Sequence, residues 1–148
     1  MRALIQRVAW ARVRVEGEQV GAIEKGLLIL LGVTHQDTTE TAAKLAAKTR
    51  KLRIFSDQAG KMNLSVDDAG GSLLVVSQFT LYGDVRGGNR PSFTNAAKPE
   101  SAEELYLAFI DNLKKSGLDV SQGRFGALME IELLNEGPVT LWLDTEHF

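Results

Sequence analysis

The amino-acid sequence predicts an α/β fold. We expect a single-domain, mixed and mostly antiparallel β-sheet or half-barrel with two main helices packed on one side. Short apolar stretches bounded by glycines and turn residues predict several strands, and two stretches with helical periodicity predict two helices. Strands outnumber helices, and their order lacks the regular βαβα alternation of a doubly wound sheet. The 148 residues fit one domain, spanning 1–148.

The first predicted strands form a hairpin. Arginine and valine alternate at the end of the stretch 4–15, which is the pattern of a half-buried strand. Residues 16–18 predict a turn, and residues 19–23 predict the returning strand. The next stretch, 26–33, is almost purely apolar and lies between glycines. It is too short for a helix and predicts a strand buried on both faces.

A helix is predicted over residues 38–53, with Asp37 or Thr38 as its N-cap. One face of this helix is apolar and holds Ala42, Leu45, Thr49 and Leu52. Another face is basic and holds Lys44, Lys48 and Lys51. The lysines could contact an anionic partner. Alternatively, they complement the helix dipole, which favours cations near the C-terminal end.

The second half of the chain predicts another buried strand and a second helix. Residues 73–76 are apolar without interruption and follow a glycine-rich turn. The second helix is predicted over residues 101–116, after Pro99. Ser101 and Glu104 have the spacing of a capping box, which would satisfy free amides at the start of this helix.

The chain is predicted to end in a β-hairpin. Apolar residues alternate with glutamates over residues 129–133, which is typical of a strand with one buried face. Residues 135–138 are typical of a turn, so we expect the chain to reverse there. Apolar residues in the stretch 139–143 then predict the returning strand. A trans Gly137–Pro138 bond is the default, since only about 5% of X-Pro bonds in folded proteins are cis.

The composition excludes several classes of protein. The chain has no cysteine, which excludes disulfides, thiolate metal sites, cysteine nucleophiles and iron–sulfur clusters. With only two histidines, a multi-histidine metal site would need carboxylates from distant parts of the chain. The longest apolar run, residues 27–31, is far shorter than the roughly 20 residues of a membrane helix. The N-terminus lacks the apolar region of a signal peptide, so we expect a soluble, cytoplasmic protein.

Charge is unevenly distributed along the chain. The net charge of −2 argues against bulk nucleic-acid binding by charge alone. Residues 1–53 hold ten Lys/Arg against five Asp/Glu, whereas residues 54–148 hold seven against fourteen. The first third could therefore present a basic face to an anionic partner. Equally, these charges could be scattered over a solvated surface.

The stretch Ser77–Tyr82 carries the clearest chemical signal. An apolar strand turns polar there, and with a period of two Gln78 and Thr80 would share one face. An amide and a hydroxyl at a strand end could face a ligand, or they could lie on the solvated side of a strand that leaves the core. No His, Lys or carboxylate lies beside Thr80 to act as its base, so a nucleophilic role is the weaker hypothesis.

Two glycine-rich loops are further candidates. Residues 87–93 combine glycines with an arginine and a phenylalanine, and residues 123–127 place Arg124 and Phe125 between glycines. Glycine lets backbone N–H groups approach an anionic or polar ligand, although flexible turns have the same composition. The chain matches no common phosphate-binding, nucleophile-elbow or zinc-protease motif.

Taken together, these motifs resemble those of the D-aminoacyl-tRNA deacylases, the D-tyrosyl-tRNA deacylase family. The resemblance covers essentially the whole chain. Its most specific parts are the SQFTL stretch and the GPVT stretch, in this order and spacing. The shared segments are 5–8, 52–55, 60–63, 77–81, 88–93, 123–127 and 135–140.

The resemblance implies a homodimeric enzyme without metal or cofactor. It would hydrolyse the ester of D-aminoacyl-tRNA, and of glycyl-tRNA mischarged on tRNA-Ala, with no role for DNA or membranes. A cis Gly-Pro motif that reaches the partner's site would reject L-amino acids. The implied catalytic residues are Ser77, Gln78, Phe79 and Thr80. The implied substrate-binding residues are Gly137, Pro138, Phe125 (near the terminal adenosine) and Met129. The implied tRNA contacts are Arg2, Lys44, Lys48, Lys51 and Arg53.

Other functions remain possible at the level of sequence. We favour Thr80 as a positioning residue and Gln78 as a polar wall of the pocket, because an aminoacyl ester is reactive and needs few catalytic groups. A general esterase or peptidase with Thr80 as nucleophile is a second hypothesis. A dimeric binding module that has kept the fold without catalysis is a third.

Overall fold

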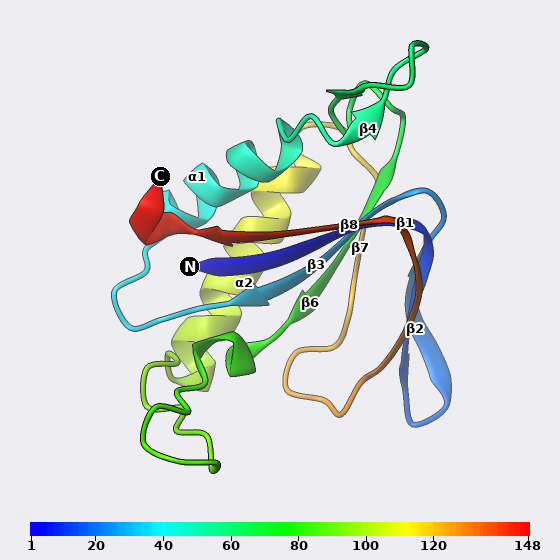
Figure 1. Cartoon of the computed structure of the whole chain (residues 1–148). Helices are drawn as coiled ribbons and strands as arrows, with labels where there is room; N and C mark the ends of the chain where they lie inside the picture. The colour runs from blue at the N-terminus through cyan, green and yellow to red at the C-terminus, as the bar shows by residue number, and fades with distance from the viewer.

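A computed structural model describes all residues, 1–148, and contains eight strands, two α-helices and two short 3₁₀-helices (Figure 1). In chain order they are β1 (Arg2–Val15), β2 (Glu18–Ile23), β3 (Gly26–Gly32), α1 (Thr39–Arg50), β4 (Phe55–Ser56), β5 (Met62–Leu64), β6 (Ser72–Ser77), η1 (Phe79–Tyr82), α2 (Pro99–Lys114), β7 (Val120–Gln122), β8 (Glu130–Asp144) and η2 (Thr145–His147). The main sheet has the order β2-β1-β3-β6-β7, and β8 pairs with β1.

The sheet is mixed and curls into a half-barrel. β1 pairs antiparallel with β2, β3 and β8, whereas β6 is parallel to both β3 and β7. The curl brings β2 close to β7, where the amide of Ala22 donates to Ser121 Oγ at 3.2 Å. The approach is so close that a Cβ on Gly21 would lie 2.6 Å from the Gln122 carbonyl oxygen. The two helices pack together on one side of the sheet (Figure 1), so the predicted fold class is confirmed.

The two central strands are buried on both faces, as predicted from their unbroken apolar runs. On β3, Leu27 and Ile29 belong to the core of 20 buried residues that includes those of the two helices, whereas Leu28 belongs to a second core of seven residues. On β6, Leu73 belongs to the core of 20 residues and Leu74 to the core of seven. Because successive strand residues point to opposite faces, one apolar run serves two cores.

The helix starts are partly as predicted. Thr38 caps α1 and forms a capping box with Thr41, but the helix ends at Arg50, three residues before the predicted end. The predicted capping box of Ser101 and Glu104 is wrong, because α2 begins earlier, at Pro99, with Lys98 as an extended N-cap. Proline suits the first helical position, since its fixed φ is helical and the missing N–H would have had no partner there.

The predicted C-terminal hairpin is also wrong. Residues 130–144 form one strand, β8, and both its halves pair with β1. Val8 pairs with Asn135, whereas Gln6 pairs with Thr140, so residues 136–139 bulge out of the ladder. The turn residues of the sequence therefore form a bulge and not a reversal.

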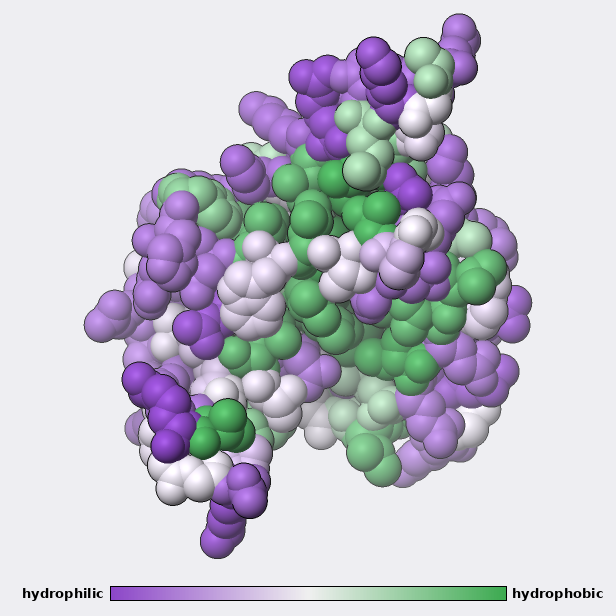
Figure 2. Space-filling view, viewed as in Figure 1, coloured by the Kyte–Doolittle hydropathy of each residue, from purple (hydrophilic) through white to green (hydrophobic).

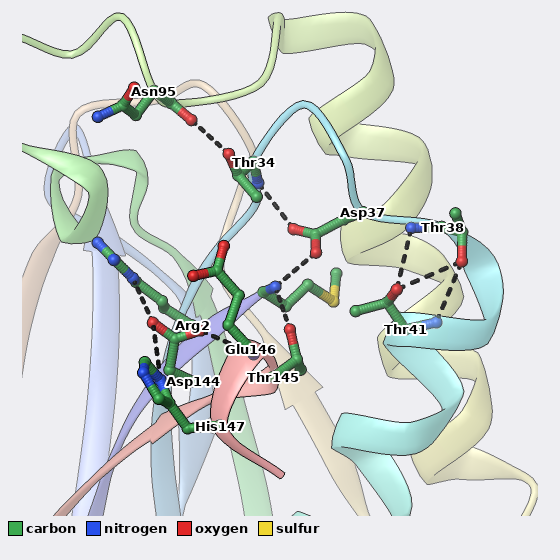
Figure 3. Close-up of polar contacts among 11 residues, drawn as sticks. Arg2, Thr34, Asp37, Thr38, Thr41, Asn95, Asp144, Thr145, Glu146 and His147 are labelled. Carbon is green, nitrogen blue, oxygen red and sulfur yellow. Dashed lines mark hydrogen bonds and ion pairs between the residues drawn. The ribbon is translucent and has the colours of Figure 1, made fainter.

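The two ends of the chain meet beside the start of α1 (Figure 3). The N-terminal ammonium of Met1 donates to Asp37 at 2.5 Å and to Thr145 at 2.6 Å, and Arg2 bonds to Asp144 at 2.8 Å. Asp37 also accepts from the amide of Thr34 at 2.7 Å. These bonds hold the connection between β3 and α1 against η2. Neither helix is long and apolar enough to cross a membrane.

Candidate active site

A pocket of about 590 Å³ opens at the C-terminal end of β6. Fourteen of its 18 lining residues are hydrophobic, and none is charged. They are Leu31, Val33, Val76, Ser77, Gln78, Phe79, Phe93, Ala96, Ala97, Pro99, Ala102, Tyr106, Phe125, Gly126, Ala127, Leu128, Met129 and Ile131. The pocket thus combines the predicted SQFTL stretch with the second glycine-rich loop. Its volume is typical of a site for a small molecule or one end of a larger one.

The front of the pocket is built where β6 gives way to η1. The predicted two-residue alternation through Tyr82 is wrong, because the strand ends at Ser77 and residues 79–82 form a 3₁₀-helix. The amide of Gln78 donates to the Leu31 carbonyl at 2.7 Å, which fixes this corner to β3. The Gln78 side chain donates through Nε2 to Thr80 Oγ1. Thr80 itself lies at the edge and does not line the pocket.

The back wall is aromatic and neutral. Tyr106 of α2 donates its hydroxyl to the Val75 carbonyl at 2.9 Å, and its ring centroid lies 5.7 Å from that of Phe125. Burial raises the pKa of Tyr106 above its ordinary value, so the phenol stays protonated at neutral pH. Met129 completes this wall beside Gly123, where a Cβ would lie 2.6 Å from the Met129 sulfur. The pocket therefore has a polar edge at Gln78 but no general acid or base.

The Gly137–Pro138 pair lies outside this pocket. Both residues are exposed on the β8 bulge, and their peptide bond is cis, as the resemblance implies. The backbone of Gly137 has a φ of +115°, which side-chain-bearing residues rarely adopt. Within one chain, the structure thus brings Ser77, Gln78, Phe79, Phe125 and Met129 together and leaves Gly137 and Pro138 apart.

Two side chains that sequence reasoning missed hold this bulge. Arg7 donates to the Ile54 carbonyl at 2.6 Å and pairs with Glu136 at 3.2 Å, and its guanidinium lies against Gly137. Asn135 donates to the carbonyls of Arg7 and Val139, both at 3.0 Å. Both side chains come from residues 5–8 and 135–140, segments already singled out by the resemblance, but nothing in the sequence alone pairs them.

The basic residues predicted to contact tRNA are spread over the molecule. Arg2 lies near the pocket corner, where it donates to the Leu81 carbonyl at 3.0 Å. Lys44 and Lys48 both lie over the ring of Phe148, at 5.3 and 5.6 Å from its centroid. Lys51 and Arg53 lie between α1 and β4, at the opposite end of the molecule from the loop that follows η1 (Figure 1). The structure does not gather these five residues into one patch.

The site is thus an uncharged pocket at the end of β6 in a half-barrel, with the Gln78 amide and the Thr80 hydroxyl at its edge. Comparison with known proteins identifies the family. The family model described as D-Tyr-tRNA(Tyr) deacylase matches residues 4–144. The chain therefore belongs to the D-aminoacyl-tRNA deacylase family, whose members are enzymes named for deacylating D-aminoacyl-tRNA.

Individual relatives agree with this assignment along nearly the whole chain. A D-aminoacyl-tRNA deacylase of Deinococcus deserti is 59% identical over 97% of this chain and 99% of its own length. One of Halalkalibacterium halodurans is 55% identical over 99% of this chain and 100% of its own length. A solved structure of a c-Myc DNA unwinding element binding protein is 41% identical, with a TM-score of 0.91, and covers 97% of this chain and 98% of its own.

Proposed function

We propose that the protein hydrolyses the ester bond of D-aminoacyl-tRNA and releases the free D-amino acid and tRNA. The uncharged pocket built by residues 77–79 and 125–129, in a chain of this family, is the observation that carries the proposal. An aminoacyl ester is reactive, and the vicinal ribose hydroxyl can assist its hydrolysis. A site that stabilises the developing oxyanion then suffices, since each donor typically contributes a few kcal/mol.

The residues at the front of the pocket supply donors of this kind. A 3₁₀-helix leaves its first N–H groups without intrahelical acceptors, so the amides of Phe79 and Thr80 remain available beside the pocket. Gln78 forms a polar wall and orients the Thr80 hydroxyl. Thr80 positions the substrate and does not attack it, because no base lies beside it. Phe125 and Met129 accommodate the terminal adenosine at the back wall.

Main-chain atoms of Gly137 and Pro138 exclude L-amino acids from the site. Because this pair lies outside the pocket of its own chain, the motif that guards each pocket comes from a second copy in a homodimer. Two large side chains exposed on β8, Leu134 at 53% and Trp142 at 49%, favour such an assembly. An L side chain would clash with the motif, whereas glycine has no side chain to reject. Glycyl-tRNA mischarged on tRNA-Ala is therefore a second substrate.

The rest of the proposal concerns the partner and its setting. Arg2, Lys44, Lys48, Lys51 and Arg53 are the residues assigned to tRNA phosphates, and phosphate contacts carry no base sequence. An enzyme that uses them can act on many tRNAs. The place of action is the cytoplasm, where translation takes place. No metal or cofactor takes part, and DNA is not the partner.

A turnover experiment tests this function directly. We expect the protein to release D-tyrosine from D-Tyr-tRNA and glycine from Gly-tRNA(Ala), and to leave L-Tyr-tRNA intact, with and without a metal chelator. Hydrolysis of L-Tyr-tRNA at the D rate would contradict the chiral filter. Because one homologous structure is described as a DNA unwinding element binding protein, a non-catalytic nucleic-acid-binding module is the second candidate. Absence of turnover with retained nucleic-acid binding would favour it.

A further inference from the structure

The loop between η1 and α2, residues 83–98, forms one side of the pocket mouth, and we call it the rim loop. Its residues Phe93, Ala96 and Ala97 line the pocket. Both its ends are fixed. The amide of Gly83 bonds to Thr80, Asp84 pairs with Ser92, and residues 94–97 bond to residues 33–35, including Thr34 Oγ1 to the Asn95 carbonyl at 2.6 Å (Figure 3). The tip between these ends projects from the molecule (Figure 1).

The rim loop is basic in a part of the chain that is otherwise acidic. It holds three of the seven Lys/Arg of residues 54–148, namely Arg86, Arg90 and Lys98, and one acidic residue, Asp84. Asp84 is already paired, since it accepts from Arg86 Nη2 at 2.6 Å and from Arg86 Nε at 2.9 Å. These bonds lower the pKa of Asp84 to about 2. Arg90 and Lys98 have no ion pair and lie exposed, so the rim loop carries two uncompensated cations.

Two aromatic rings stand at the same mouth. Phe79 is 56% exposed and Phe93 is 38% exposed, and both line the pocket. Their rings meet edge to face, with centroids 5.0 Å apart and an interplanar angle of 70°. The hydropathy surface shows apolar and polar areas side by side over one face of the molecule (Figure 2). Exposed rings beside free cations are the combination by which proteins bind single-stranded nucleic acid, with bases stacked and phosphates paired.

We propose that the rim loop binds the unpaired nucleotides that precede the esterified one at the 3′ end of tRNA. Phe93 stacks on a base, and Arg90 and Lys98 contact the phosphates. This inference rests on the proposed function, which puts the amino acid and the terminal nucleoside inside the pocket. A pocket of about 590 Å³ has the size of a small-molecule site. With those two groups inside it, the preceding nucleotides lie at its mouth. Lys51 and Arg53 lie at the other end of the molecule and cannot serve this stretch (Figure 1).

The test compares D-Tyr-tRNA with D-tyrosyl-adenosine, which carries the ester but no phosphate and no preceding nucleotide. Arg90→Gln should raise KM for D-Tyr-tRNA about three- to tenfold, with kcat unchanged and with D-tyrosyl-adenosine hydrolysed as by the unchanged protein. Its salt dependence should become shallower, by a slope of about 0.7 for one lost phosphate contact on a single strand. Arg90→Lys should restore most of the loss. Phe93→Leu should raise KM for D-Tyr-tRNA more than for the adenosine ester.

The control is Lys61→Gln, an exposed lysine in the turn between β4 and β5 at the far end of the molecule (Figure 1). It should leave both substrates unaffected. A KM for D-Tyr-tRNA that stays within about twofold in Arg90→Gln at low salt would overturn the proposal. So would an equal loss on the adenosine ester, since that ester lacks the phosphates. If the unchanged protein cleaves neither ester, the proposed function itself fails, and the rim-loop proposal fails with it.

Discussion

The Thr80 hydroxyl is hydrogen-bonded to a side-chain amide, and no base lies beside it. Its hydroxyl accepts from Gln78, and no lining residue of the adjacent pocket is charged. If Thr80 only positions the substrate, Thr80→Ala should lower kcat/KM for D-Tyr-tRNA by about ten- to 200-fold, or about 1–3 kcal/mol of transition-state stabilisation. Thr80→Ser, which keeps the hydroxyl, is the matched control. Complete loss in Thr80→Ala, with an acyl ester trapped on Thr80 of the unchanged protein, would establish a nucleophile instead.

Asp144 is a buried acid whose negative charge stabilises the fold. Burial opposes its ionisation, but bonds from the Glu146 amide and the Arg2 guanidinium outweigh burial and keep the pKa of Asp144 below its ordinary value. A lowered pKa means that the stabilisation is complete above the unfolded pKa, near 4, and is lost as the pH falls through the folded pKa.

Asp144→Asn tests this contribution. The substitution should lower the free energy of unfolding at pH 7 by about 2 kcal/mol, the usual scale for a charged hydrogen bond. The difference from the unchanged protein should shrink below pH 4, because the unchanged protein then loses the same charge. Urea unfolding at pH 7, 5 and 3 measures it. A difference that stays constant down to pH 3 would contradict the assignment.

At the level of single residues, the sequence predicts those parts of the site that lie within one continuous stretch of the chain. Ser77, Gln78 and Phe79 could be predicted because an apolar strand ends there in polar and aromatic residues. Arg7 and Asn135 could not, because their roles arise from contacts between residues 128 positions apart. A single arginine or asparagine forms no recognisable sequence pattern. Its role becomes visible only when the position of the partner strand is known.

Asn135 is one of the two side chains that hold the β8 bulge. Asn135 donates to the carbonyls of Arg7 and Val139, across the bulge from strand to strand. Asn135→Ala leaves two carbonyls without this donor and should cost about 1–3 kcal/mol of unfolding free energy. D-Tyr-tRNA turnover should fall by more than this stability loss explains, since the bulge carries Gly137 and Pro138. Asn63→Ala, at an exposed position, is the control. An Asn135→Ala variant that is as stable and as active as the unchanged protein would contradict this role of Asn135.

Elements differ in how far their sequence determines them. The unbroken apolar runs of β3 and β6 predict strands buried on both faces, and they are, because no other position in this fold satisfies such a run. The hairpin prediction for residues 129–143 failed because turn residues and bulge residues are the same types. Only the length of β1, 14 residues, decides between them, since it can pair with both halves of β8. That pairing is not a local property of the sequence.

At the scale of the whole molecule, the pocket and the Gly137–Pro138 bulge are separate features of one chain. The pocket opens at the end of β6, and the bulge protrudes from β8 beside Arg7. If both serve one reaction, a second copy must bring them together. Each active site then contains Thr80 of one protomer and Gly137 of its partner, and a twofold dimer contains two such sites.

Mixing two defective chains tests this arrangement. Thr80→Ala weakens the pocket, and Gly137→Ala disturbs the bulge, because its Cβ would lie 2.9 Å from the Val139 amide nitrogen at a φ of +115°. Each homodimer should be poorly active. In a heterodimer one site has both defects and the other has neither, so random reassociation should restore roughly a quarter of the activity of the unchanged protein toward D-Tyr-tRNA. Restored sites should still refuse L-Tyr-tRNA. A mixture that shows only the mean of its two parents would contradict a site shared between two chains, because a site built within one chain would always keep one defect.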